Sequence, residues 1–153
     1  MSDYCDLEKL PKKIDIFITF RYEEAETEAI AIQNYFVQKG FSVFVCPRSC
    51  PGEDLVPMIA TAISTAKLVV LLRTRTYGKP TDSYGTYNEM MMTVKTKKDQ
   101  FLVLQMEECS VPETELVIPH SIFYITWDEN WKPGSPPPPE VVKGIESKLV
   151  QIV

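Results

Sequence analysis

The 153-residue sequence has little that would bind nucleic acid or cross a membrane. It carries 16 lysines and arginines against 21 aspartates and glutamates, and this acidic balance argues against a basic nucleic-acid-binding stripe. Its longest uninterrupted apolar run, residues 68–72, is far shorter than the ~20 residues of a membrane span. Residues 1–13 lack the apolar stretch of a secretory signal. We therefore expect a cytoplasmic protein without membrane insertion or nucleic-acid partners, large enough for one domain with its own core.

Histidine and cysteine are also scarce. The single histidine, His120, lies between Pro119 and Ser121 in an expected loop, so a Ser-His or Cys-His mechanism would depend on it alone. The four cysteines show no paired two-residue spacing of the zinc-ribbon kind; they are Cys5, Cys46, Cys50 and Cys109. We expect four reduced thiols and no metal site.

What the sequence does contain is an alternation of strand-like and helix-like segments. We expect strands at residues 14–20, 41–45, 67–72, 101–106 and 122–126. We expect helices at residues 23–39, around 87–98 and at 140–153. A short helix is expected after Leu55, with Pro57 in its first turn and with Ile59, Ala62, Ile63 and Ala66 facing inward. Gly40 is expected to end the first helix. The alternation predicts an α/β fold, a flavodoxin-like three-layer sandwich with a five-stranded parallel sheet in the order 2-1-3-4-5 and helices on both faces.

This strand order predicts where a ligand would bind. The order switches between strands one and three, so a crevice is expected at their carboxyl ends, between residues 21–24 and 73–87. The glycine-rich fingerprint of a dinucleotide fold is absent there, because the chain reads Phe20-Arg-Tyr-Glu-Glu24. A Walker loop is also absent, and Leu72-Arg-Thr74 lacks the phosphoacceptor aspartate of a response regulator. We expect no tightly bound nucleotide cofactor.

Several segments, in the right order, resemble those of Toll/interleukin-1 receptor (TIR) domains. They are the apolar strand ending in an aromatic residue and an arginine (14–21), the second strand (40–44), a Pro-Gly loop tip (50–54), the stretch into the third strand (62–72), and the segments 74–77 and 87–90. The resemblance covers residues 13–153 and leaves 1–12 as an N-terminal extension. It implies a signalling module of innate-immunity type whose partners are other TIR domains. The implied interaction loop comprises Arg48, Cys50, Pro51, Gly52, Glu53 and Asp54.

Some TIR domains also cleave NAD+ at the nicotinamide–ribose bond, by hydrolysis or cyclisation, with a helix glutamate as catalytic residue. By motif position this residue is Glu89, and NAD+ is a substrate, with no bound cofactor. Nicotinamide in NAD+ already carries positive charge, so it leaves without a general acid. One carboxylate close to the ribose stabilises the oxocarbenium-like charge that develops. Neither histidine nor metal is required.

The resemblance also implies substrate-binding residues at the crevice. Arg21 is expected to engage the pyrophosphate or to orient the crevice. Aromatic side chains are expected to stack on a planar ring; the candidates are Phe20, Tyr22, Tyr77, Tyr84 and Tyr87. The family often has tryptophan shortly before the glutamate, whereas this chain reads Tyr84-Gly-Thr-Tyr-Asn-Glu-Met90, so Tyr84 or Tyr87 would replace it. The usual acid after the second strand is replaced by Val45-Cys46.

Alternative interpretations remain open beside this one. Glu89 could be a solvated surface charge, and Arg21 could pair with Glu23 or Glu24. The chain could then be a non-enzymatic TIR adaptor that acts through TIR–TIR interactions, or a nucleotide binder unrelated to TIR domains. The leading interpretation is self-association coupled to NAD+ nucleosidase activity.

Two side-chain patterns on the helix at 87–98 predict exposure. Consecutive residues cannot all face the core of one helix, so at least one of Met90, Met91 and Met92 should be exposed. Lys95, Lys97 and Lys98 are expected to form a solvated helix end, where positive charge is favourable.

Overall fold

The computed structural model describes residues 13–45, 55–75, 77, 86–97, 100–106 and 124–151. Its strands are β1 (Ile14–Thr19), β2 (Val43–Val45), β3 (Ala66–Arg73), β4 (Phe101–Gln105) and β5 (Tyr124–Thr126). Its helices are α1 (Tyr22–Gln38), α2 (Leu55–Thr65), α3 (Thr86–Lys97) and α5 (Pro139–Gln151). Each predicted bound lies within two residues of the observed one.

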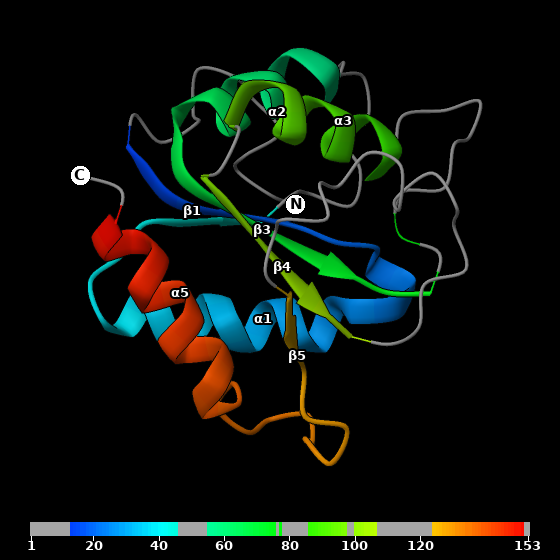
Figure 1. Ribbon diagram of the computed structural model, residues 1–153, viewed down its shortest axis with the longest axis vertical. Coiled ribbons are helices and arrows are strands. Elements are labelled where there is room, and N and C mark those ends of the chain that lie inside the picture. Colours follow the sequence, from blue (N-terminus) through cyan, green and yellow to red (C-terminus); the bar gives the residue numbers. More distant parts are fainter. Residues whose placement is uncertain are drawn as a thin grey trace.

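The strands form one parallel sheet in the order β2-β1-β3-β4-β5. Helices α2 and α3 cover one side, which we call the α3 face, and α1 and α5 cover the other, the α1 face (Figure 1). The predicted flavodoxin-like fold is therefore confirmed. The predicted extension at residues 1–12 lies outside the described residues.

The core consists of two apolar layers separated by the sheet. Phe17 of β1 packs on the α3 face and its ring stacks on Phe44 at 5.5 Å between centroids, whereas Ile18 packs on the α1 face. Alternate residues of β3 divide between the faces in the same way, because successive side chains of a strand point to opposite sides. Central strands covered on both sides are apolar throughout, and this explains the near-continuous apolar runs of β1 and β3.

Helix α1 ends where the sequence predicts. Gly40 has φ of +95°, a left-handed conformation that costs glycine little, and its N–H donates to the Val37 carbonyl at 3.0 Å. The N–H of Phe41 donates to the Phe36 carbonyl at 3.0 Å, and the two rings meet edge to face at 5.7 Å. This is a Schellman motif with its apolar contact, and it turns the chain toward β2.

The methionine and lysine predictions for α3 have different outcomes. Met91 is 40% exposed while Met90 is fully buried, so the methionine prediction is confirmed. Lys95 is exposed, but Lys97 is buried, and the prediction that Lys97 belongs to a solvated helix end is wrong. The Lys97 ammonium donates to the carbonyls of Ser64 at 3.1 Å and Ala66 at 2.5 Å, where α2 gives way to β3. It thus satisfies carbonyls at the end of one helix from the end of another.

Burial lowers the pKa of Lys97 below the ordinary value of 10.5, because desolvation disfavours the charged form. As pH rises, Lys97 loses its proton in the folded protein before it does so in the unfolded chain. The free energy of unfolding therefore increases with pH until the pH reaches about the pKa of a lysine in the unfolded chain. We expect the urea midpoint of the wild type to rise relative to that of Lys97→Met as the pH increases toward 10.5. Lys95→Met, at an exposed position, is the control. Equal pH profiles for wild type and Lys97→Met would contradict the assignment.

Candidate functional site

The site lies at the carboxyl ends of β1 and β3, where the strand order switches. Thr19, the last residue of β1, pairs in register with Leu71, so β3 continues two residues further, to Arg73. The chain turns from β1 into α1 through Arg21, whose carbonyl accepts from the N–H of Glu24 at 3.0 Å. The Glu24 carboxylate in turn accepts a hydrogen bond from the Thr74 hydroxyl. The two predicted walls of the crevice are therefore joined directly.

Glu89 lies in the first turn of α3 and is only 4% exposed. Its Oε1 accepts a hydrogen bond from the Thr19 hydroxyl at 2.5 Å. Negative charge is favourable at a helix N-terminus, and a hydrogen bond offsets part of the cost of burial. The alternative that Glu89 is a solvated surface charge is therefore wrong for this structure.

Thr19 connects Glu89 with one of the predicted aromatic residues. The Thr19 hydroxyl lies 3.0 Å from the hydroxyl of Tyr77, and both side chains are fully buried. Tyr77 lies in the core of the α3 face, so its ring has no exposed surface on which a ligand could stack in this structure. A stacking role for Tyr77 stays a prediction without support from its placement.

The other predicted residues are placed as follows. Phe20 is buried in the core of the α1 face, on the side of the sheet opposite Glu89. Arg21 is partly exposed, and its Nε lies 3.9 Å from a carboxylate oxygen of exposed Glu23, the pairing that the alternative interpretation expected. The backbones of Tyr22 and Tyr87 belong to α1 and α3. Tyr84 and the interaction-loop residues Arg48, Cys50, Pro51, Gly52, Glu53 and Asp54 lie outside the described residues.

Sequence reasoning missed two polar residues at this edge, Thr19 and Arg73. Arg73 is 4% exposed, and its Nη1 donates to Oε1 of Gln105, at the end of β4, at 3.2 Å. Strand alternation places it on the same face as Val69 and Leu71, which is the face of Glu89. Both residues could have been found from the sequence, because each is a polar residue at the end of an apolar strand. The carboxyl ends of parallel strands form the edge of the sheet at which proteins of this class bind ligands.

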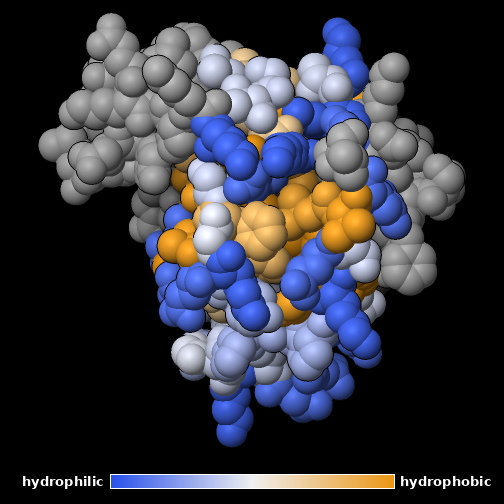
Figure 2. All heavy atoms as spheres, turned by 90° about the vertical axis from the view of Figure 1, so that its left-hand side faces the viewer, coloured by the Kyte–Doolittle hydropathy of each residue, from blue (hydrophilic) through white to orange (hydrophobic). Residues whose placement is uncertain are grey.

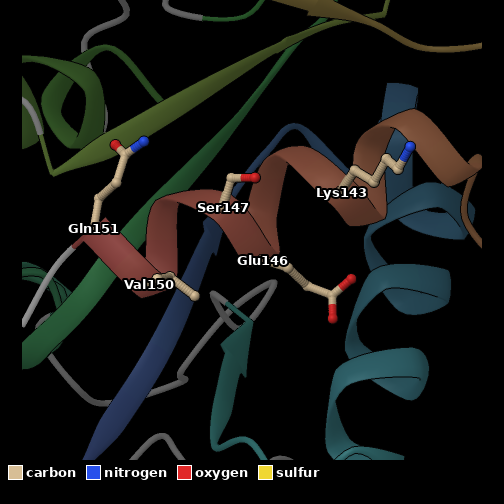
Figure 3. Close-up of a pocket in the computed structure, with 5 residues that line it drawn as sticks. All are labelled: Lys143, Glu146, Ser147, Val150 and Gln151. Atoms are coloured by element: carbon tan, nitrogen blue, oxygen red, sulfur yellow. The ribbon is translucent and has the colours of Figure 1, made fainter.

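A shallow hollow elsewhere on the surface is not this site. Among the residues that the structure describes, its lining comes from α5, through Lys143, Glu146, Ser147, Val150 and Gln151, whose side chains point in several directions (Figure 3). Because α5 covers the α1 face, the hollow is separated from Glu89 by the sheet. Within the described residues, no three side chains of histidine, cysteine, aspartate or glutamate gather as a metal site would require.

The side of the molecule where α1 and α5 end carries hydrophobic residues surrounded by hydrophilic ones (Figure 2). Val150 near the end of α5 is 75% exposed, and Val37 near the end of α1 is 51% exposed. Exposed apolar side chains are surfaces that contact with another protein would remove from water.

Comparisons with known proteins support the fold. No protein-family model matches the sequence, and no curated protein matches it. Among solved structures, the chain is similar to the TIR domains of the activated Roq1 resistosome, which directly recognises the pathogen effector XopQ. The TM-score is 0.52 and the identity 17%, over 67% of this chain and 61% of that one.

It is also similar to the TIR domain of the Toll-related receptor TRR-2 from Hydra magnipapillata. That TM-score is 0.53 and the identity 15%, over 91% of this chain and 97% of that one. At these identities the likeness establishes the fold. The resemblance to TIR domains is thus confirmed at the level of the fold.

Proposed function

We propose that this chain is a TIR-type signalling module that self-associates and cleaves NAD+ at the nicotinamide–ribose bond, with Glu89 as the catalytic residue. The observation that carries the proposal is the buried Glu89 carboxylate, hydrogen-bonded by Thr19 at the switch point of the sheet. Buried ionisable groups at such edges are candidates for function, because their burial is costly and sheets of this class bind ligands there.

Cleavage of NAD+ requires few catalytic groups from the protein. The bond between ribose C1′ and the nicotinamide nitrogen breaks, and its electron pair neutralises the ring that leaves. Positive charge passes to the ribose, where a fixed carboxylate stabilises it. Attack by water then gives linear ADP-ribose and a proton, and attack by a ring nitrogen of the adenine gives a cyclic product. Partly exposed Arg21, at the end of β1, is suited to hold the diphosphate.

The self-association part of the proposal is based on a protein of similar fold. The TIR domains of Roq1 form part of an activated resistosome, and this chain spans 61% of that chain's length. The loop of Arg48 and 50–54 stays the predicted contact surface. Cytoplasmic location also stays a prediction; within the described ranges, no helix has the length and apolarity to cross a membrane.

The test is incubation of concentrated protein with NAD+, followed by chromatography for nicotinamide. We expect the rate per mole of protein to rise with protein concentration, because the proposed function couples cleavage to self-association. Parallel light scattering on the same samples should show larger particles over the same concentration range. No nicotinamide release at any concentration, even after forced clustering on a bead or through a fused oligomer, would exclude NAD+ cleavage.

Association without catalysis is the second candidate function. The exposed apolar side chains of Val37, Val150 and Met91 favour it, because contact with a partner would remove them from water. Concentration-dependent scattering without nicotinamide release is the result expected for such an adaptor.

A further inference from the structure

We propose that Thr19 is a positioning residue for Glu89 and that Tyr77 sets the direction in which the Thr19 hydroxyl donates. The inference rests on the proposed NAD+ cleavage and adds to it the means by which the carboxylate is held. None of the TIR-like motifs in the sequence includes Thr19 in such a role.

The position of Thr19 makes it a rigid support. It is the last residue of β1, which pairs with β2 on one side and β3 on the other, and its side chain is fully buried. Its Oγ1 lies 2.5 Å from Oε1 of Glu89, a residue 70 positions away in the chain. The carboxylate is thus attached to the centre of the sheet as well as to its own helix.

The direction of the hydrogen bonds follows from proton count. A threonine hydroxyl has one proton, and Thr19 donates it to the Glu89 carboxylate, which accepts only. The contact of 3.0 Å with Tyr77 must then be donated by the tyrosine hydroxyl. Donation from Tyr77 to Thr19 and from Thr19 to Glu89 forms a chain in which each bond polarises the next.

The backbone of Glu89 is held separately from its carboxylate. Its carbonyl accepts from the Thr93 hydroxyl at 2.7 Å, one turn later in α3, and neighbouring Met90 is fully buried in the core. Helix packing therefore sets the position of the backbone, and Thr19 selects the direction of the side chain. A carboxylate held in one place before the reaction stabilises developing charge without the cost of reorganisation.

The test compares Thr19→Val, which removes the hydroxyl at nearly constant volume, with Thr19→Ser, which retains it. We expect Thr19→Val to lower kcat for nicotinamide release by about 10–100-fold with KM changed less than about threefold, because a carboxylate no longer held in place stabilises the charge of the transition state less well. Thr19→Ser should keep kcat within about threefold of the wild type, and Tyr77→Phe should give a smaller loss than Thr19→Val.

The surface pair Thr27–Glu28 supplies a matched control, since the Thr27 hydroxyl donates to Oε1 of Glu28 at 2.6 Å in an exposed place on α1. Thr27→Val should leave kcat unchanged. A readout independent of activity is the urea midpoint of Thr19→Val, Glu89→Gln and the double variant. If the two side chains are coupled as described, the midpoint shifts are not additive.

The outcomes separate this inference from the function on which it rests. Unchanged kcat in Thr19→Val, or equal losses in the valine and serine variants, would overturn the positioning role while wild-type activity keeps NAD+ cleavage standing. Additive midpoint shifts would overturn the direct coupling of Thr19 and Glu89. No activity in the wild type would overturn the proposed function and, with it, the positioning role, whatever the midpoint shifts show.

Discussion

Replacing Glu89 with glutamine is expected to lower nicotinamide release by about 10²–10³-fold, the range measured when one group that stabilises transition-state charge is removed. Glutamine has nearly the same shape, and its carbonyl oxygen can still accept from the Thr19 hydroxyl, whose distance to the carboxylate is 2.5 Å. The fold should therefore survive while the negative charge beside the ribose is lost. The measurement is kcat at saturating NAD+, with near-ultraviolet circular dichroism as the check on folding.

Glu140→Gln is the matched control, because Glu140 also lies in the first turn of a helix but is exposed on α5. It should leave the rate unchanged. If Glu89→Gln releases nicotinamide at the wild-type rate, a carboxylate other than Glu89 stabilises the charge on the ribose. Glu24, which accepts from Thr74 at the same edge of the sheet, is then the next residue to replace.

Phe17→Ala is expected to lower the free energy of unfolding by about 3–5 kcal/mol, a large part of the 5–15 kcal/mol typical of a domain. Phe17 is fully buried on a central strand and its ring stacks on Phe44 at 5.5 Å between centroids. Its removal leaves a cavity between β1 and the helices of the α3 face, where rigid strands cannot close it. Urea unfolding followed by circular dichroism gives the measurement.

Val37→Ala is the control, since Val37 is 51% exposed and its truncation should cost less than about 0.5 kcal/mol. Phe17→Leu should cost less than Phe17→Ala because it keeps most of the volume. A loss below about 1 kcal/mol in Phe17→Ala would show that this layer of the core is loosely packed. Phe17 precedes Thr19 by two residues on the same face of β1, so this layer also supports the site.

Local patterns were sufficient to predict the elements of this fold. The apolar run of β1, the helical spacing of α1 and the stop at Gly40 are each readable within a few residues of sequence. The strand order followed from alternation, because right-handed crossovers and short connections leave few arrangements of five parallel strands. The motif around Glu89 was likewise a local feature.

The environments of individual polar side chains were less predictable. Lys97 is a lysine near a helix end, and such lysines are usually solvated. Here it is buried against the end of α2, because the packing of α2 beside α3 brings Ser64 and Ala66 within reach of its ammonium. Tyr77 and Phe20 seemed equally suited to a crevice, yet they lie buried on opposite faces of the sheet. No local sequence pattern predicts against which face of the sheet a residue will pack when it lies beyond the end of a strand.

The sequence by itself determined the α/β class, the order of elements and the place where the strand order switches, because these depend on periodicity and connection rules. Only the tertiary structure decided that Glu89 is buried rather than solvated, and that the Thr19 hydroxyl contacts both the Glu89 carboxylate and the Tyr77 hydroxyl. Thr19 and Glu89 are 70 positions apart, and their contact exists only once β1 is central in the sheet and α3 is packed across its face. A hydrogen bond of 2.5 Å depends on how whole helices and strands are placed relative to one another, and the spacing of residues along the chain does not determine that placement.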